Sequence, residues 1–391
     1  MSRVAINKDL IRWAVDRSGQ EKSALVERFP KLPQWESGEV QPTFKQLEDF
    51  AKATLTPFGA FFLPVPPQEK LPVPDFRTMR DQRPRRPSAA LLETIYLMQR
   101  RQEWMREYLM EEGAEALPFI GTVTLASSPL AAAESIRRTL GMEDGWAELH
   151  PTWSNALLGL RRAVEDTGVL VVVNGVFGNN THQALDPEEF RGFVLCDRHA
   201  PLIFINGADF KSAQMFTLAH ELAHLWLGKD GVFNLPDLQA SGDEIEKFCN
   251  RVAAEVLIPT RELEACWPEV KAGSDPYNAL ARRFKVSPIV AARRVLDLDL
   301  ISREAFYTFL NAYMAEEKQR QQRKSSRGDF YKTQEVRVGH RFGGAVIRAA
   351  RAGKLLYKDA YRLTDLYGRA FDQFAEELGC GPARQCCTTP N

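Results

Sequence analysis

Long apolar runs are missing from this chain of 391 residues. No stretch approaches the roughly eighteen consecutive apolar residues that a membrane-spanning helix needs. The segment from Met1 to Asp16 mixes charged side chains with short apolar pieces and lacks the apolar core of a secretory signal. The sequence therefore predicts a soluble, cytoplasmic protein with no membrane partner.

Cysteine and net charge are also scarce. Six scattered cysteines do not form the dense framework of a small disulfide-rich secreted domain, so reduced thiols are expected. Lys and Arg together number 51, as do Asp and Glu, which leaves a formal net charge of zero. A balanced charge gives no global reason to expect a nucleic-acid or membrane-surface protein. At this length about two or three domains are expected.

Histidine is rare too, with six in the chain, yet His220 and His224 flank Glu221 in an H-E-x-x-H pattern. The apolar residues of segment 210–227 and the Gly228 that follows predict one helix. Residues four apart lie on one helical face, so both imidazoles can reach a single metal ion while Glu221 points toward its open coordination position. A polar interruption of a core helix is the alternative, but it would bury three ionisable groups without a metal to bind them. The pattern predicts zinc-dependent peptide hydrolysis with Glu221 as the general base.

A zinc site with two histidines needs a third protein ligand. The nearest acidic cluster lies on a helix expected over residues 243–258, which offers Glu244, Glu246 and Glu255. Helical periodicity places Glu246 and Glu255 beside opposite edges of the apolar stripe and does not choose between them. Glu246 shares its side of the helix with the small Ala253, which leaves room for a neighbouring helix and favours this glutamate.

The roles of Glu246 and of Asn250 stay open. The carboxylate of Glu246 follows Asp243 by three residues, a spacing that also occurs in capping boxes with no catalytic function. Asn250, one turn after Glu246, either orients that carboxylate or bonds to the nearby backbone. The sequence does not identify the donor that stabilises the oxyanion, and the candidates are His182, Tyr277, Tyr307 and Tyr313.

Three short apolar segments precede the metal helix: residues 169–173, 192–196 and 202–205. They predict a small antiparallel sheet whose edge strand can pair with an extended substrate, holding the scissile bond over the metal. The loop over residues 177–186 is expected to border the cleft. The peptidase domain is predicted to span residues 130–300.

Residues 7–63 contain short helical segments separated by turn residues, as in a helix-turn-helix bundle. Trp35 is expected in the core, Gly38 in a turn, and Thr43 as the cap of the last helix. Nine basic and eight acidic side chains between residues 3 and 52 leave about one net positive charge, which is little for a duplex binder. The bundle binds DNA or docks a protein, and the sequence leaves both open.

The remaining segments connect or follow these domains. Prolines and arginines mark residues 67–90 as a linker, and helical periodicity predicts a connector over residues 91–129. Residues 301–391 are predicted to be a basic helical region, with eleven basic and two acidic side chains between 318 and 354. This basic stretch could bind DNA, or it is a solvated face.

Two motifs resemble the ImmA/IrrE family of zinc metallopeptidases. They are His-Glu-Leu-Ala-His at 220–224 and the segment 246–259, which follows the family form E-x-x-A-N-x-F-A-A-x-L-L-M-P apart from mild departures at Cys249, Val252 and Ile258. Residues 32–51 also resemble a repressor-type, Xre-like DNA-binding domain, which would occupy residues 1–66. The resemblance implies an α+β chain: a zincin-like peptidase domain of a small antiparallel sheet and metal-site helices, flanked by helical regions.

The resemblance also implies roles. His220, His224 and Glu246 would hold Zn²⁺ as in a gluzincin-like metalloendopeptidase, with Glu221 as the base. The substrate would be a partner transcriptional repressor or antitoxin, cut in a stress, phage or mobile-element response. The alternative is a DNA-binding regulator or toxin component whose metallopeptidase-like fold does not cleave. An intact base favours cleavage.

Overall fold

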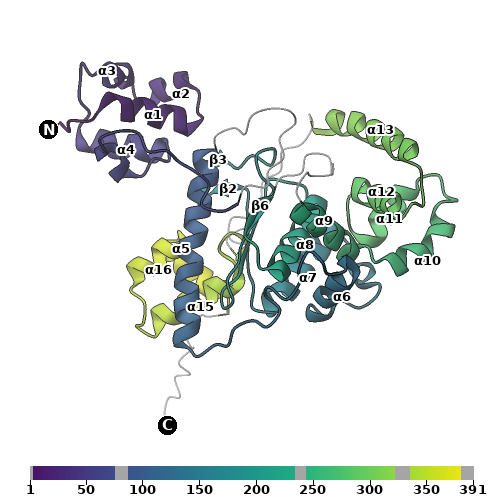
Figure 1. Cartoon of the computed structure of the whole chain (residues 1–391). Helices are drawn as coiled ribbons and strands as arrows, with labels where there is room; N and C mark the ends of the chain where they lie inside the picture. The colour runs from purple at the N-terminus through teal and green to yellow at the C-terminus, as the bar shows by residue number, and fades with distance from the viewer. Residues whose placement is uncertain (1–2, 75–86, 234–243, 322–334, 380–391) are drawn as a thin grey trace, which may run out of the picture. The chain divides into compact units, whose positions relative to one another are not determined.

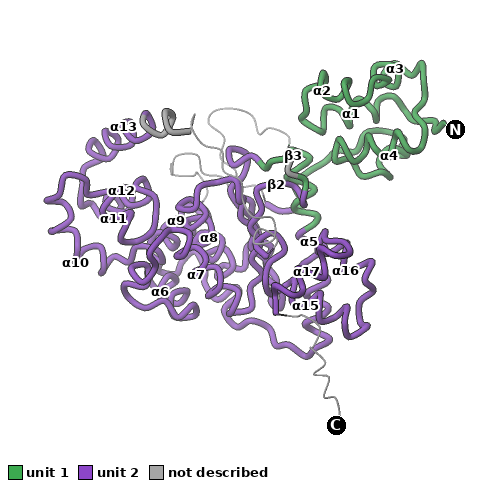
Figure 2. Tube along the Cα trace, turned by 180° about the vertical axis from the view of Figure 1, so that it is seen from behind, with its two compact units in different colours: residues 1–72, 79–97, 180–185 green, residues 73–78, 98–179, 186–391 purple. Residues whose placement is uncertain are grey.

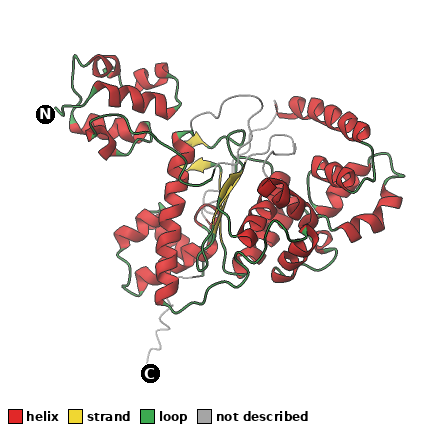
Figure 3. Ribbon diagram, in the orientation of Figure 1, coloured by secondary structure: helices red, strands yellow, loops and turns green. Residues whose placement is uncertain are grey.

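The computed structural model describes residues 3–74, 87–233, 244–321 and 335–379. Helices and a small sheet together give the mixed α and β fold that the sequence predicts (Figure 3). The chain divides into two compact units (Figure 2), of which the first contains Met1–Pro72, Met79–Leu97 and Asn180–Leu185. Among the described residues, no helix has the length and apolarity to cross a membrane.

The first unit is built on a bundle of short helices at the N-terminus. Phe50 packs edge to face against both Phe29 and Trp35 at its centre, and Trp35 is buried as predicted. Gly38 ends a helix with φ of 84°, a conformation that favours glycine. Thr43 caps the next helix in a capping box with Gln46. The elements of this unit are α1 Lys8–Ser18, α2 Lys22–Arg28, α3 Leu32–Ser37, α4 Phe44–Ala53, the 3₁₀ helix η1 Phe58–Phe62 and β3 Asn180–Ala184.

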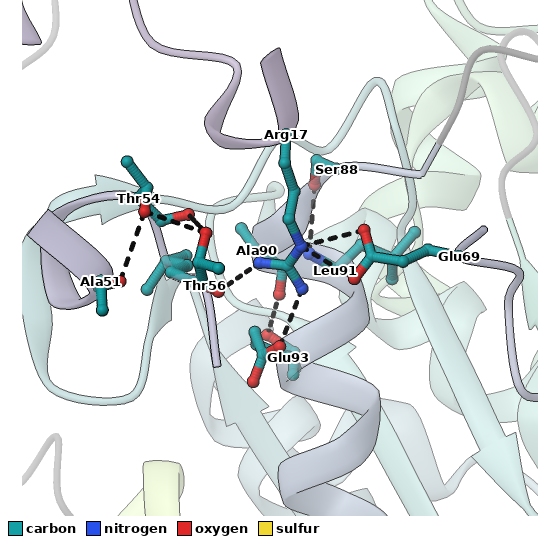
Figure 4. A network of polar contacts seen from close by, with 11 residues as sticks. Arg17, Ala51, Thr54, Thr56, Glu69, Ser88, Ala90, Leu91 and Glu93 are labelled. Atoms are coloured by element: carbon teal, nitrogen blue, oxygen red, sulfur yellow. Dashed lines mark hydrogen bonds and ion pairs between the residues drawn. The ribbon is translucent and has the colours of Figure 1, made fainter. Parts of the chain in front are cut away.

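A buried arginine joins three segments of the first unit (Figure 4). The Nε atom of Arg17 lies 2.8 and 2.9 Å from the two carboxylate oxygens of Glu69, and Nη2 lies 2.9 Å from Glu93. Its Nη1 donates to the carbonyl of Leu55. Charge-assisted hydrogen bonds of this kind are the strong ones in proteins. Arg17 therefore joins Glu69 and the N-terminal part of α5 to helix α1.

The second unit contains a four-stranded sheet in the order β1-β5-β4-β6. Strand β4 pairs antiparallel with β5 and β6, but β1 pairs parallel with β5. The prediction of a wholly antiparallel sheet was therefore wrong. Strand β4 lies between β1 and β5 in the sequence and runs in the opposite direction to both, so β1 and β5 run in the same direction. The strands are β1 Leu170–Asn174, β4 Gly192–Leu195, β5 Leu202–Asn206 and β6 Gly231–Phe233, and the short β2 Val176–Phe177 follows β1 outside this sheet.

Helices cover both faces of the sheet (Figure 1). Helix α8 packs on β4 and β5, and α7 packs on β1, while α15 contacts β1 from the opposite face together with the second half of α5. Every residue of β1, β4 and β5 is buried, as expected of strands covered on both sides. The helices named here are α5 Ala89–Glu111, α7 Trp153–Asp166, α8 Lys211–Leu227 and α15 His340–Arg351.

The remaining helices complete the second unit. They are α6 Pro129–Thr139, η2 Trp146–Leu149, α9 Glu244–Leu257, α10 Thr260–Val270, α11 Pro276–Phe284, α12 Pro288–Asp297, α13 Arg303–Gln321, α16 Tyr357–Thr364 and α17 Arg369–Glu377. The C-terminal helices are anchored by Arg101 of α5, whose guanidinium donates to the carbonyls of Leu363 and Arg337 at 2.8 and 3.1 Å. Burial lowers the pKa of Arg101 to about 10.

The basic stretch over residues 318–354 does not form one exposed face in the described part of the chain. Arg337 donates to Asn179, and burial lowers the pKa of both Arg337 and Arg341. Arg348, Arg351 and Lys354 are exposed. Four further basic residues lie outside the described residues: Arg323, Lys324, Arg327 and Lys332.

Candidate metal centre

Helix α8 carries the H-E-x-x-H pattern and is buried continuously from Gln214 to its end. The expected helix is confirmed, and Gly228 ends it with φ of 65°. His220, Glu221 and His224 are each at most 1% exposed. Buried ionisable groups are costly unless they are paired, hydrogen-bonded or bound to a metal ion. The residues around these three side chains therefore indicate their role.

Helix α9 packs along α8 and brings Glu246 against both imidazoles. The Nε2 atoms of His220 and His224 lie 3.1 Å apart. The carboxylate oxygens of Glu246 lie 3.1 Å from His224 Nε2 and 3.3 Å from His220 Nε2. The three side chains thus offer ligand atoms that converge on one point, and all three are buried.

These separations fit a small divalent cation. A tetrahedral zinc ion with bonds of about 2.0 to 2.2 Å has ligand atoms about 3.3 to 3.6 Å apart. The ligand atoms of His220, His224 and Glu246 lie 3.1 to 3.3 Å apart, near the lower end of this range. Three protein ligands leave a fourth tetrahedral position for water or substrate, as in catalytic zinc sites.

Asn250 sets the orientation of a candidate ligand, although not the one expected. Its Oδ1 atom lies 3.0 Å from Nδ1 of His220, whereas the sequence suggested an interaction with Glu246 or the backbone. The amide oxygen only accepts, so it holds the imidazole proton on Nδ1 and leaves the lone pair of Nε2 facing His224 and Glu246. The contact with Asn250 therefore favours the tautomer of His220 whose Nε2 lone pair faces His224 and Glu246.

Protonation states in the centre match the same role. Burial lowers the pKa of His220, against the attraction of Glu246, and so favours the neutral ring. Burial by itself would raise the pKa of Glu246, but its close contacts with His220 and His224 lower it to about 2. A neutral imidazole and an ionised carboxylate are the forms that bind metal ions.

Glu221 lies beside these three side chains with a different environment. Within the described part of the chain neither of its carboxylate oxygens has a hydrogen-bond partner. Burial, and then the charge of Glu246, raise the pKa of Glu221 well above its ordinary value. A buried carboxyl with a raised pKa is the usual state of a proton-transfer group.

Gly192 makes room for Glu221. A Cβ atom at this position would lie 3.1 Å from Oε1 of Glu221 and 2.6 Å from Cγ2 of Thr217. Only glycine therefore allows strand β4 to pass this close to α8 at Glu221. Sequence reasoning did not assign Gly192 a role, and its signal was a glycine at the first position of a strand.

Glu255, the competing ligand candidate, faces away from the centre. Its carboxylate accepts hydrogen bonds from the backbone nitrogen and the hydroxyl of Thr260, at 2.8 and 2.7 Å, and pairs with Arg294. These contacts fix the junction between α9 and α10. The structure thus separates two carboxylates that helical periodicity could not.

The tyrosine candidates for oxyanion stabilisation belong to another cluster. Tyr277 and Tyr313 pack on Phe309, with ring centroids 4.4 and 5.8 Å away, in the region of α11 and α13. Tyr307 is 52% exposed on α13. The side chain of His182 lies outside the described residues.

Two family models match the chain. The Peptidase M78 model, described as the IrrE N-terminal-like domain, matches residues 179–296 and thus includes α8 and α9. A domain of unknown function, DUF8813, matches residues 338–377, which contain α15, α16 and α17. No curated protein matches the chain. The first match supports the resemblance to the ImmA/IrrE family and a metallopeptidase-type function.

Proposed function

We propose that this chain is a zinc-dependent endopeptidase that cleaves a specific partner protein, a helix-turn-helix repressor or antitoxin. The convergence of His220, His224 and Glu246 beside Glu221 carries the proposal. These residues supply three ligands, an open position and a base, and each is required for metal-assisted hydrolysis. Residues 130–300 would form the peptidase domain.

Each side chain has a task in this reaction. Zinc, when bound, acts as a Lewis acid and lowers the pKa of water. Glu221 accepts a proton from the attacking water and passes it to the leaving amine. Asn250 keeps the proton of His220 on Nδ1 so that Nε2 faces the cation. The apolar surroundings of α8 exclude bulk water and strengthen these interactions.

The partner is inferred from the resemblance together with the N-terminal bundle. ImmA/IrrE proteins cut regulators, and the Xre-like bundle over residues 1–66 would recognise DNA or a partner in a stress, phage or mobile-element response inside the cell. A DNA-binding regulator with a non-cleaving fold is the alternative. It would have no use for a glutamate buried beside the ligands, so Glu221 favours the enzyme.

Co-expression with the small helix-turn-helix product of a neighbouring gene tests the proposal. We expect cleavage of that product by the full chain and none by Glu221→Gln, with equal zinc content in both proteins. Cleavage that survives the substitution would remove Glu221 as the base. Intact product in both cultures, with zinc present, would support the non-cleaving alternative.

A further inference from the structure

A four-residue sequence occurs twice between residues 63 and 74. Leu-Pro-Val-Pro stands at 63–66 and again at 71–74. The two valines are flanked identically, yet Val65 is 64% exposed and Val73 only 7%. Local sequence cannot explain this difference, so a specific docking position must bury Val73.

That position is at the edge of the catalytic sheet. The backbone nitrogen of Val232 in β6 donates to the carbonyl of Pro74 at 3.1 Å. Strand β4 pairs with the other side of β6, with Val232 opposite Phe193. Val73 and Pro74 accordingly group with the unit that contains the sheet, while the residues up to Pro72 group with the other unit.

The hydrogen bond at this edge satisfies a buried group. Val232 is completely buried with the segment in place, and its outward-facing N–H finds its acceptor in the carbonyl of Pro74. An extended peptide that adds to a sheet edge supplies such an acceptor. The outer side of β6 is therefore built to receive a main-chain carbonyl.

The edge is also close to the candidate metal centre. Phe233 of β6 lies opposite Gly192 of β4, and Gly192 is the residue that passes directly by the carboxylate of Glu221. Neighbouring strands are about 4.8 Å apart, so a segment on the outer side of β6 lies about 10 Å from the β4 backbone. Only β6 would separate a bound peptide there from the strand that passes Glu221.

We propose that the outer edge of β6 is the substrate-docking edge of this centre, and that Val73 and Pro74 occupy it as an internal pseudosubstrate. The inference rests on the proposed function. Pro72 and Pro74 lack a backbone N–H and cannot extend the pairing, so the segment is held by few main-chain bonds and can be displaced. The partner would present an extended segment with a branched aliphatic side chain in the position of Val73.

Amide hydrogen exchange tests the docking. In the full chain, Val73→Asp should release the segment and make exchange over residues 231–233 at least about tenfold faster. Val65→Asp is the matched control, because it places the same charge in the same tetrapeptide at an exposed position. The milder Val73→Thr covers the case in which the aspartate variant does not fold. Unchanged exchange at 231–233 in a folded Val73 variant would overturn the inference.

A peptide-binding experiment distinguishes an edge that docks substrates from an edge that the segment only covers. A fluorescent peptide of residues 67–74 should bind Val73→Asp at least about tenfold more tightly than the unsubstituted chain, because the tethered competitor has left. The same peptide with aspartate at its valine should not bind. Exchange that accelerates without peptide binding would show that the segment only covers the edge, and would refute the pseudosubstrate.

The same variants distinguish this inference from the proposed function. Faster cleavage of the helix-turn-helix partner by Val73→Asp, but not by Val65→Asp, supports both. Peptide binding to Val73→Asp without cleavage by any variant would reject the peptidase and retain the docking edge. Cleavage by the unsubstituted chain at the same rate as by Val73→Asp would retain the peptidase and reject the pseudosubstrate.

Discussion

Asn250 Oδ1 lies 3.0 Å from Nδ1 of His220, so a residue of α9 sets the proton position on an imidazole of α8. Glu246 stands one turn before Asn250 on the same helix and contacts the Nε2 atoms of both histidines. One helix thus delivers both the third candidate ligand and the group that orients the first. The packing of α9 on α8 therefore sets the geometry of the candidate centre.

Replacing Asn250 should weaken metal binding without removing a ligand. Loss of an outer hydrogen bond to a metal-binding histidine typically reduces metal affinity by about 10- to 100-fold, so we expect Asn250→Ala to bind zinc correspondingly less tightly. Competition with a fluorescent chelator measures the affinity. Asn250→Asp keeps an acceptor for the Nδ1 proton and should recover much of it. Equal affinity in all three proteins would contradict an orienting role.

Changing Glu246 or Glu255 to glutamine should have different effects, on zinc binding in the first case and on stability in the second. Glu246→Gln should lose zinc as measured by elemental analysis, because it removes an ionised ligand. Glu255→Gln should keep zinc but lower the free energy of unfolding by about 3 to 5 kcal/mol, since Arg294 would remain buried with its carboxylate partner gone. Zinc loss in the Glu255 variant alone would reverse the two assignments.

Gly192→Ala should impair cleavage while zinc stays bound. The added Cβ would meet Thr217 and the carbonyl of Phe204 within 3 Å and press on Oε1 of Glu221. Overpacking of this kind costs about 1 to 3 kcal/mol of stability. Gly59→Ala is the control, because nothing lies within 4 Å of a Cβ there. Partner cleavage and zinc content are measured together, and normal cleavage by folded Gly192→Ala would show that Glu221 tolerates the contact.

The sequence was sufficient where local rules act alone. The spacing of His220 and His224 predicted their shared helical face, and the capping residue Thr43 was found from turn chemistry. Contacts between segments that lie far apart in the sequence could not be predicted. The side of α9 that faces the histidines depends on how two helices pack, so Glu246 and Glu255 stayed equivalent by periodicity.

The direction of β1 and the close approach of β4 to α8 also depend on contacts between segments that lie far apart in the sequence. The parallel pairing of β1 with β5 depends on which edge of β5 is left open by β4, which no local pattern encodes. The role of Gly192 depends on the distance between β4 and α8. The burial of Val73 but not Val65, in identical tetrapeptides, shows most directly that tertiary position decides what a short sequence does.

Arg17→Met should destabilise the first unit, because it leaves Glu69 and Glu93 facing each other without their shared cation. Removing one partner of a buried ion pair costs about 3 to 5 kcal/mol. These carboxylates keep 22% and 17% of their side-chain surface exposed, so we expect the lower part of that range or somewhat less. Arg12→Met is the matched control, since the pair of Arg12 with Asp9 is solvent-exposed and should contribute about 0 to 1 kcal/mol. Amide exchange over α1 and thermal unfolding measure the loss of stability in both variants. Equal losses of stability would mean that the contacts of Arg17 contribute no more than an exposed ion pair.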